Sequence, residues 1–185
     1  MRTQLCLDFS FFAVAALFFM MDKSGAGLCA LSACIVHELS HLIVMAAFGI
    51  RPDGITCYGA GIRISCGSLE NAPVYQRTAV YAAGVAANFI MSAIFFLCGV
   101  PLGAYINLFT GAFNLLPLGE LDGARLLKMA VMHRCRAENI DTVMRAAGIV
   151  SAGICAAAAL LLRNGVSFTL ITTAVYFIIL GARRV

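Results

Sequence analysis

The chain has 185 residues, of which 62% are hydrophobic and 12% charged, and its formal net charge is +4. A soluble domain has about 45–50% apolar and about 25% charged residues. A chain of this length cannot hide such an apolar surplus in one core, since about a third of its surface stays outside. The composition therefore argues against a soluble globular protein, a disordered chain and a disulfide-stapled secreted module, and it predicts a polytopic membrane protein.

Six apolar runs are each expected to form a membrane-spanning helix, because about 20 apolar residues cross a bilayer. They cover residues 5–21, 27–48, 78–98, 102–116, 145–162 and 166–180. The predicted fold class is an all-α polytopic membrane protein with about six transmembrane helices, organised as a single domain over residues 1–185. A cleaved signal peptide is the alternative for the first run, although only Arg2 forms its basic region.

The segment between the second and third runs is polar and contains Gly and Pro. Residues 54–58 and 62–66 are predicted to form two short strands, joined by a turn at 59–61. The predicted hairpin could offer an edge to an extended substrate by β-augmentation, or it could be an ordinary surface hairpin. Arg63 within it is interpreted as an interface anchor.

Pro117 and Gly119 interrupt the fourth run. Residues 102–116 would form only about 22 Å of helix, whereas the hydrocarbon core is about 30 Å thick. We therefore expect the break to lie at membrane depth, where irregular backbone is tolerated only inside protein or beside a wet cavity. An amphipathic, basic segment, residues 121–136, follows it.

Orientation follows from the positive-inside rule. With six spans, eleven of the thirteen Lys and Arg residues lie on one side, and only Lys23 and Arg163 lie on the other. The first side is predicted to be cytoplasmic, which places both termini there.

The second run contains His37-Glu38-Leu39-Ser40-His41, an HExxH motif. Residues four apart lie one turn apart on the same helix face, so the two imidazoles can bind one tetrahedral zinc ion. Glu38 lies on the neighbouring edge and can reach a metal-bound water. Ionisable residues in a spanning helix are costly and indicate function.

Catalytic zinc usually takes three protein ligands. His133 lies in a basic loop and is interpreted as solvated, which leaves Glu120 and Asp122 as candidates. Both follow the broken fourth run and reach the membrane side of the two histidines. The segment from Asn114 to Gly123 is therefore interpreted as the second half of the site.

The two motifs together resemble the site-2 protease family of intramembrane zinc metallopeptidases. HExxH in one spanning helix is followed by an NxxPxxxLDG element in a later one, and Gly84-Val85-Ala86-Ala87-Asn88 is similar to the family's GxxxN element. The catalytic core would cover about residues 27–130. The chain leaves no room for a PDZ or nucleotide-sensing domain, so it resembles the small, minimal members of the sporulation-protease type.

The resemblance implies a role for each matching position. His37, His41 and Asp122 would bind one zinc ion, Glu38 would activate the zinc-bound water, and Asn88 and Asn114 would bind substrate. Two family positions differ mildly, at Leu115 and Ala124.

The expected function is hydrolysis of a peptide bond in or near a transmembrane segment of a membrane-tethered protein. The expected partners are that substrate, the lipid bilayer and a possible regulatory membrane protein, with no nucleic acid. The expected location is a bacterial cell membrane, with the active site towards the cytoplasm. The alternatives are an inactive relative that binds membrane segments and a small metal transporter.

Overall fold

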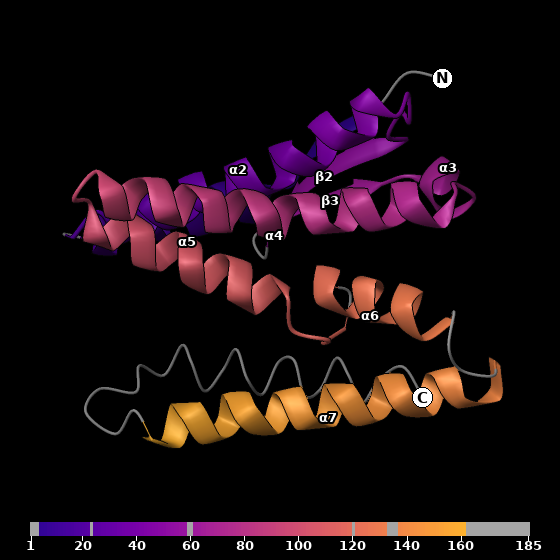
Figure 1. Ribbon diagram of the computed structural model, residues 1–185. Helices are drawn as coiled ribbons and strands as arrows, with labels where there is room; N and C mark the ends of the chain where they lie inside the picture. Colours follow the sequence, from indigo (N-terminus) through magenta and orange to yellow (C-terminus); the bar gives the residue numbers. More distant parts are fainter. Residues whose placement is uncertain (1–3, 23, 59–60, 120, 133–136, 162–185) are drawn as a thin grey trace. The chain divides into compact units, whose positions relative to one another are not determined.

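The computed structural model describes residues 4–22, 24–58, 61–119, 121–132 and 137–161. It falls into two compact units, residues 1–113 and 114–185. The elements of the first unit are β1 (Gln4–Leu7), α1 (Phe9–Met21), α2 (Ala26–Ala47), β2 (Gly54–Tyr58), β3 (Gly61–Ser65), α3 (Gly67–Glu70), α4 (Val74–Leu97) and α5 (Pro101–Asn114). Those of the second are α6 (Asp122–Met132) and α7 (Ala137–Leu161) (Figure 1).

The mostly helical character of the chain is confirmed, but the number of membrane spans is not. Within the described segments, α2 and α4 are long and apolar enough to cross a membrane, judged by length and composition. Helices α1 and α5 have 13 and 14 residues, which is short of the roughly 20 that a spanning helix needs. The run predicted at 166–180 lies outside the described residues, so six transmembrane helices remain a prediction.

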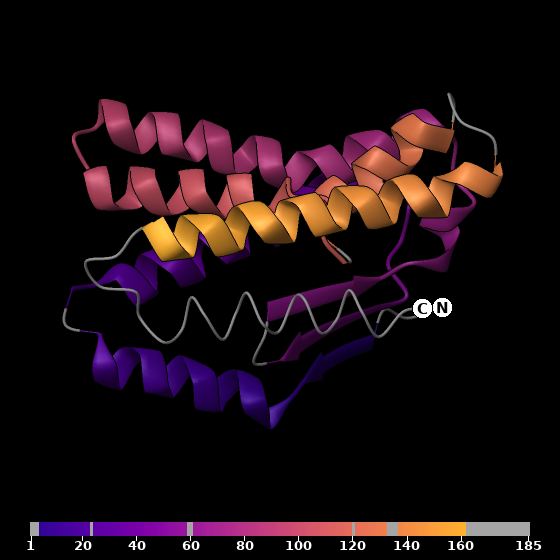
Figure 2. The same ribbon diagram turned by 90° about the horizontal axis from the view of Figure 1, so that it is seen from below.

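The prediction of a helix beginning at residue 5 is wrong for its first residues. Gln4–Leu7 forms β1, which pairs in parallel with β2, and β2 pairs antiparallel with β3. The sheet therefore has three strands, in the order β1-β2-β3, where the sequence predicted only a hairpin (Figure 2). A short apolar run cannot be assigned to strand or helix by periodicity. Here Asp8 separates β1 from α1, because its carboxylate accepts a hydrogen bond from the Ser10 amide at 2.7 Å.

The predicted hairpin itself is confirmed, with its second strand at 61–65 instead of 62–66. Ile55 lies opposite Ile64 and Cys57 opposite Ile62. Residues 59 and 60 of the predicted turn lie outside the described residues. Because β2 is flanked on both sides, the sheet's free edges belong to β1 and β3.

Local interactions fix both ends of α2. The Asp22 carboxylate accepts hydrogen bonds from the Ser24 hydroxyl at 2.6 Å and from the Gly27 amide at 2.6 Å, which satisfies a donor at the start of the helix. These bonds favour the ionised form, with Ser24 the largest cause, and lower the pKa of Asp22 below its ordinary value. At the other end Gly49 has φ +70°, and the Ile50 amide donates to the Met45 carbonyl at 2.9 Å.

Two helices extend beyond the apolar runs that predicted them. Helix α4 begins at Val74 instead of 78, directly after Pro73, and α7 begins at Ala137 instead of 145. Hydropathy locates the apolar part of a helix, whereas backbone hydrogen bonds continue through polar turns. In the second unit the predicted break is confirmed, because the chain between α5 and α6 leaves the helix near Pro117 and Gly119 has φ +54°.

A small apolar cluster joins α2, α3 and α4 in the first unit. Met45, Leu69 and Val80 are buried together, and half-buried hydrophobic residues from the same helices, their flanking segments and β3 pack around them. Met45 and Val80 bring the end of α2 against the start of α4. The cluster thereby holds the two long helices side by side.

Met45→Ala is expected to lower the free energy of unfolding by about 2–4 kcal/mol, because it leaves a cavity at a side chain that is only 1% exposed. Denaturation in detergent micelles would measure the change. The control is Leu97→Ala, at a side chain that is 84% exposed. An equal loss of stability in both variants would contradict the cluster's structural role.

Candidate metal centre

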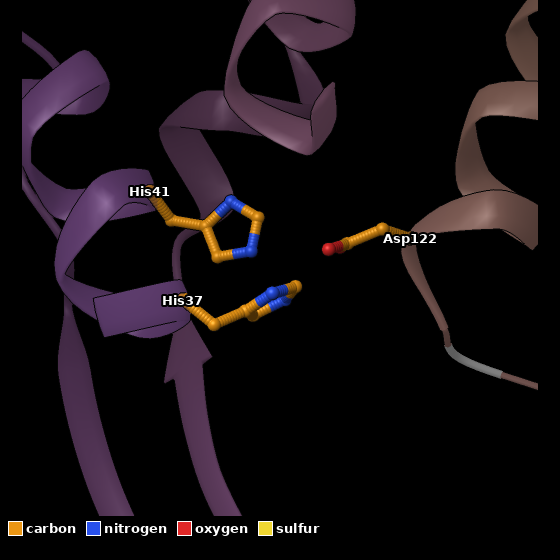
Figure 3. Close-up of side chains that lie close together, drawn as sticks. All are labelled: His37, His41 and Asp122. Carbon is orange, nitrogen blue, oxygen red and sulfur yellow. The ribbon is translucent and has the colours of Figure 1, made fainter. Parts of the chain in front are cut away.

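His37 and His41 project from one face of α2. The buried residues of this helix recur every four positions, at Ala33, His37, His41 and Met45, which is the spacing of one helix face. Figure 3 shows the two imidazoles on neighbouring turns of α2, both directed to the same side. Their ligand nitrogens lie within 4.8 Å of each other. The predicted pairing of these two histidines is therefore present.

Gly84 of α4 makes the close approach of the second helix to these rings possible. A Cβ atom at Gly84 would lie 2.6 Å from Nε2 of His37 and 2.6 Å from Nε2 of His41. Real Cβ atoms do not come so near to other heavy atoms. Any side chain at this position would therefore displace the imidazoles or push α4 away from α2. The two Nε2 atoms consequently converge beside the bare backbone of α4.

The orientation of the His41 ring is fixed by the main chain of α4. Nδ1 of His41 lies 2.7 Å from the carbonyl oxygen of Val80. A carbonyl oxygen only accepts hydrogen bonds, so Nδ1 is the donor and carries the proton of the neutral ring. Nε2 is then left with its lone pair for a ligand. Metal-binding histidines characteristically hold their second ring nitrogen in this way.

Glu38 directly follows His37 on α2 and is half-buried. Successive residues are about 100° apart around a helix, so its carboxylate leaves α2 beside the two imidazoles and not between them. The role of Glu38 next to a metal stays a prediction.

Asp122 is the first residue of α6 and is buried; Figure 3 also draws its side chain. A carboxylate at a helix N-terminus is favoured by the helix dipole. Its position depends on Gly123, where a Cβ atom would lie 1.9 Å from the Leu115 carbonyl oxygen. Gly123 thus lets the start of α6 press against the backbone of residues 115–116. Glu120, the other candidate ligand, and His133, interpreted from the sequence as solvated, lie outside the described residues.

The two predicted asparagines lie on different helices. Asn88 is one turn beyond Gly84 on the same buried face of α4 and is 0% exposed. Both polar atoms of its amide are buried, and neither has a hydrogen-bond partner in the part of the chain that the structure describes. Asn114 is the last residue of α5 and is half-buried.

Asn107 is a buried polar residue of the described segments that the sequence did not lead us to expect at the site. Asn107 of α5 is 1% exposed, and its Oδ1 atom is buried without a hydrogen-bond partner. The signal was present, because an amide in the middle of an apolar run expected to span a membrane is costly.

The donor set on α2 fits a zinc ion. Two nitrogens at about 2.0–2.1 Å from a tetrahedral zinc lie about 3.3 Å apart, which is compatible with the spacing of the two imidazoles. The proton of His41 lies on Nδ1, and Gly84 places no side chain against either Nε2 atom. The residues of the first unit therefore supply two of the ligands that such an ion requires.

Gly84→Ala is expected to weaken zinc binding at least about tenfold, because the new methyl group collides with both Nε2 atoms. Zinc titration of the purified protein against a competing chelator would measure the affinity. Gly153→Ala is the matched control, since a Cβ atom there meets nothing within 4 Å. Wild-type zinc affinity in Gly84→Ala would contradict this account of α4.

Comparison with known proteins gives concordant matches in sequence and in structure. No protein-family model matches the chain. A Mycobacterium tuberculosis protein with the provisional name zinc metalloprotease Rip3, present in strains Erdman and H37Rv, is 27% identical over 154 residues. The match covers 75% of this chain and 38% of that protein, so the chain spans well under half of its relative's length.

A solved structure shares the fold. The site-2 protease from Methanocaldococcus jannaschii matches with a TM-score of 0.67 over 97% of this chain and 89% of that one, at 18% sequence identity. The fold is that of a site-2 protease although few residues are shared. Together the two matches support assignment of the chain to the site-2 protease family, as its paired motifs indicate.

Proposed function

We propose that the chain is an intramembrane zinc endopeptidase, which hydrolyses a peptide bond in or near a transmembrane segment of a membrane-tethered protein. The observation that carries this proposal is the convergence of His37 and His41 beside Gly84. The two helices that provide these residues are the two described helices long and apolar enough to cross a membrane. A metal held there would act below the membrane surface.

His37, His41 and Asp122 would hold one zinc ion. Two neutral imidazoles and one carboxylate would neutralise only part of the charge of a zinc ion, so the occupied site would keep a net positive charge. Bound zinc supplies a Lewis acid that lowers the pKa of a coordinated water towards about 7. Asp122 is favoured over Glu120 because Gly123 fixes the start of α6, and with it the Asp122 backbone.

Glu38 would act as the proton carrier. In hydrolysis the water oxygen adds to the carbonyl carbon, Glu38 accepts the water proton, and the proton passes to the amide nitrogen as the C–N bond breaks. Its position beside His37 suits this role. Water must reach Glu38, so the proposed reaction requires a polar path from the cytoplasm to this side chain.

Asn88 and Asn114 would bind the substrate main chain. A peptide bond inside a helix is inaccessible, so the substrate must become extended before cleavage. Asn88 offers a buried donor and a buried acceptor, neither of which has a hydrogen-bond partner among the described residues. The edge of β3 is a further place where an extended segment could pair.

The proposal places the chain in the lipid bilayer as a multi-pass protein of a bacterial cell membrane. Both termini and the active site would face the cytoplasm, and a regulatory membrane protein could control access. A metal transporter fits less well, because transport gives no reason for a glutamate beside the first histidine. An inactive relative would retain the imidazole pair but would not need Glu38.

Glu38→Gln is expected to reduce peptide hydrolysis by about 10²–10⁴-fold while zinc stays bound, because it removes the proton acceptor but no ligand. The rate can be followed with fluorescently labelled β-casein in detergent micelles, and zinc content by elemental analysis. In cells, membrane-protein fragments that accumulate with the wild type but not with Glu38→Gln would identify substrates. Normal cleavage by this variant would refute the general-base role of Glu38.

Asp122→Ala is expected to weaken zinc binding by at least about 100-fold, since it removes a whole ligand. Chelator competition would measure the loss, with Glu120→Ala as the control that should bind zinc normally. If zinc affinity fell in Glu120→Ala but not in Asp122→Ala, the third ligand would be Glu120.

A further inference from the structure

Helices α4 and α5 bring two buried amides to the same level of the first unit. The Ser92 hydroxyl donates to the Ala104 carbonyl at 2.8 Å, and a Cβ atom at Gly111 would lie 3.2 Å from Cβ of Asn88. Asn107 stands between Ala104 and Gly111 on the buried face of α5. It therefore faces α4 between Ser92 and Asn88, which are one turn apart.

These amides hold unused hydrogen-bonding atoms. Nδ2 of Asn107 donates to the Gly103 carbonyl at 2.9 Å, which leaves its Oδ1 atom without a partner. Both amide atoms of Asn88 are likewise unpaired. The two side chains are 1% and 0% exposed. Each buried polar atom without a partner costs free energy, and the cost is larger in hydrocarbon than in water.

An unwound substrate inside the membrane also carries polar groups that lack hydrogen-bond partners. Once its helix is opened, each residue carries an N–H and a C=O that lipid cannot satisfy. An extended chain advances about 3.3 Å per residue, and one helical turn is about 5.4 Å. A strand passing the imidazoles beside Gly84 would thus reach Asn88 within about two residues, and Asn107 soon after.

We propose that Asn107 is a second receptor for the substrate main chain: its Oδ1 atom accepts an N–H of an extended segment that Asn88 also holds. This inference rests on the proposed peptidase function and assigns to it a residue outside the paired motifs. Because Asn107 would contact the substrate main chain, it would not select particular side chains. The property that a substrate then needs is a helix that can unwind.

The test measures binding separately from cleavage. Asn107→Leu is nearly isosteric and removes only the amide. In the Glu38→Gln background, fluorescence anisotropy with labelled β-casein should show about three- to tenfold weaker binding for Asn107→Leu. With Glu38 present, KM should rise by a similar factor while kcat and zinc content stay near wild type. The melting temperature should stay equal or rise, since an unpaired buried atom is removed.

Ser92→Ala is the matched control, because it deletes a polar group of the same helix pair whose hydrogen bond is already made within the protein. It should bind β-casein normally. If Asn107→Leu is unstable, Asn107→Ser should give the same direction of effect. Unchanged binding in the Asn107 variants, an equal loss in Ser92→Ala, or a fall in kcat alone would overturn the assignment. If the parent neither binds nor cleaves β-casein, the proposed peptidase function itself fails.

Discussion

The contact between the two imidazoles and the bare backbone at Gly84 is the constraint on which the first unit depends. It sets how closely α4 approaches α2, and it directs both Nε2 atoms to the same place. The Val80 carbonyl, one turn earlier on α4, fixes the proton of His41 on the far side of the ring. One helix thus carries the two imidazoles, while the other limits how closely it approaches them at Gly84 and selects the tautomer of His41.

The same helix pair explains why polar residues are tolerated among apolar ones. His37 and His41 are enclosed by α4, and Asn88 and Asn107 lie where α4 meets α5. Buried polar groups of a membrane protein normally find partners inside the bundle. His41 follows this rule through the Val80 carbonyl of α4. The amides of Asn88 and Asn107, by contrast, keep atoms without a partner among the described residues, which is the pattern expected where a ligand completes the hydrogen bonds.

Much of this arrangement could be predicted from local sequence. The four-residue spacing of His37 and His41 determines their common face, and Pro117 with Gly119 determines the break before α6. The strand at Gln4–Leu7 could not be predicted, because its pairing with β2 depends on residues about fifty positions away. The facing positions of Asn88 and Asn107 likewise arise only when α4 and α5 pack. That Asp122 binds the same metal ion as the two histidines remains a prediction, since it depends on the packing of a segment about eighty residues downstream.

The parallel pairing of β1 with β2 has a consequence for biogenesis. Parallel neighbours need a connection that returns to the same end of the sheet, so α1 and α2 must carry the chain outwards and back. At about 5–20 residues per second of translation, β1 waits several seconds for the ribosome to deliver Gly54–Tyr58. Both helices must therefore be synthesised before the sheet can close, which makes the order of events during synthesis part of how this fold is reached.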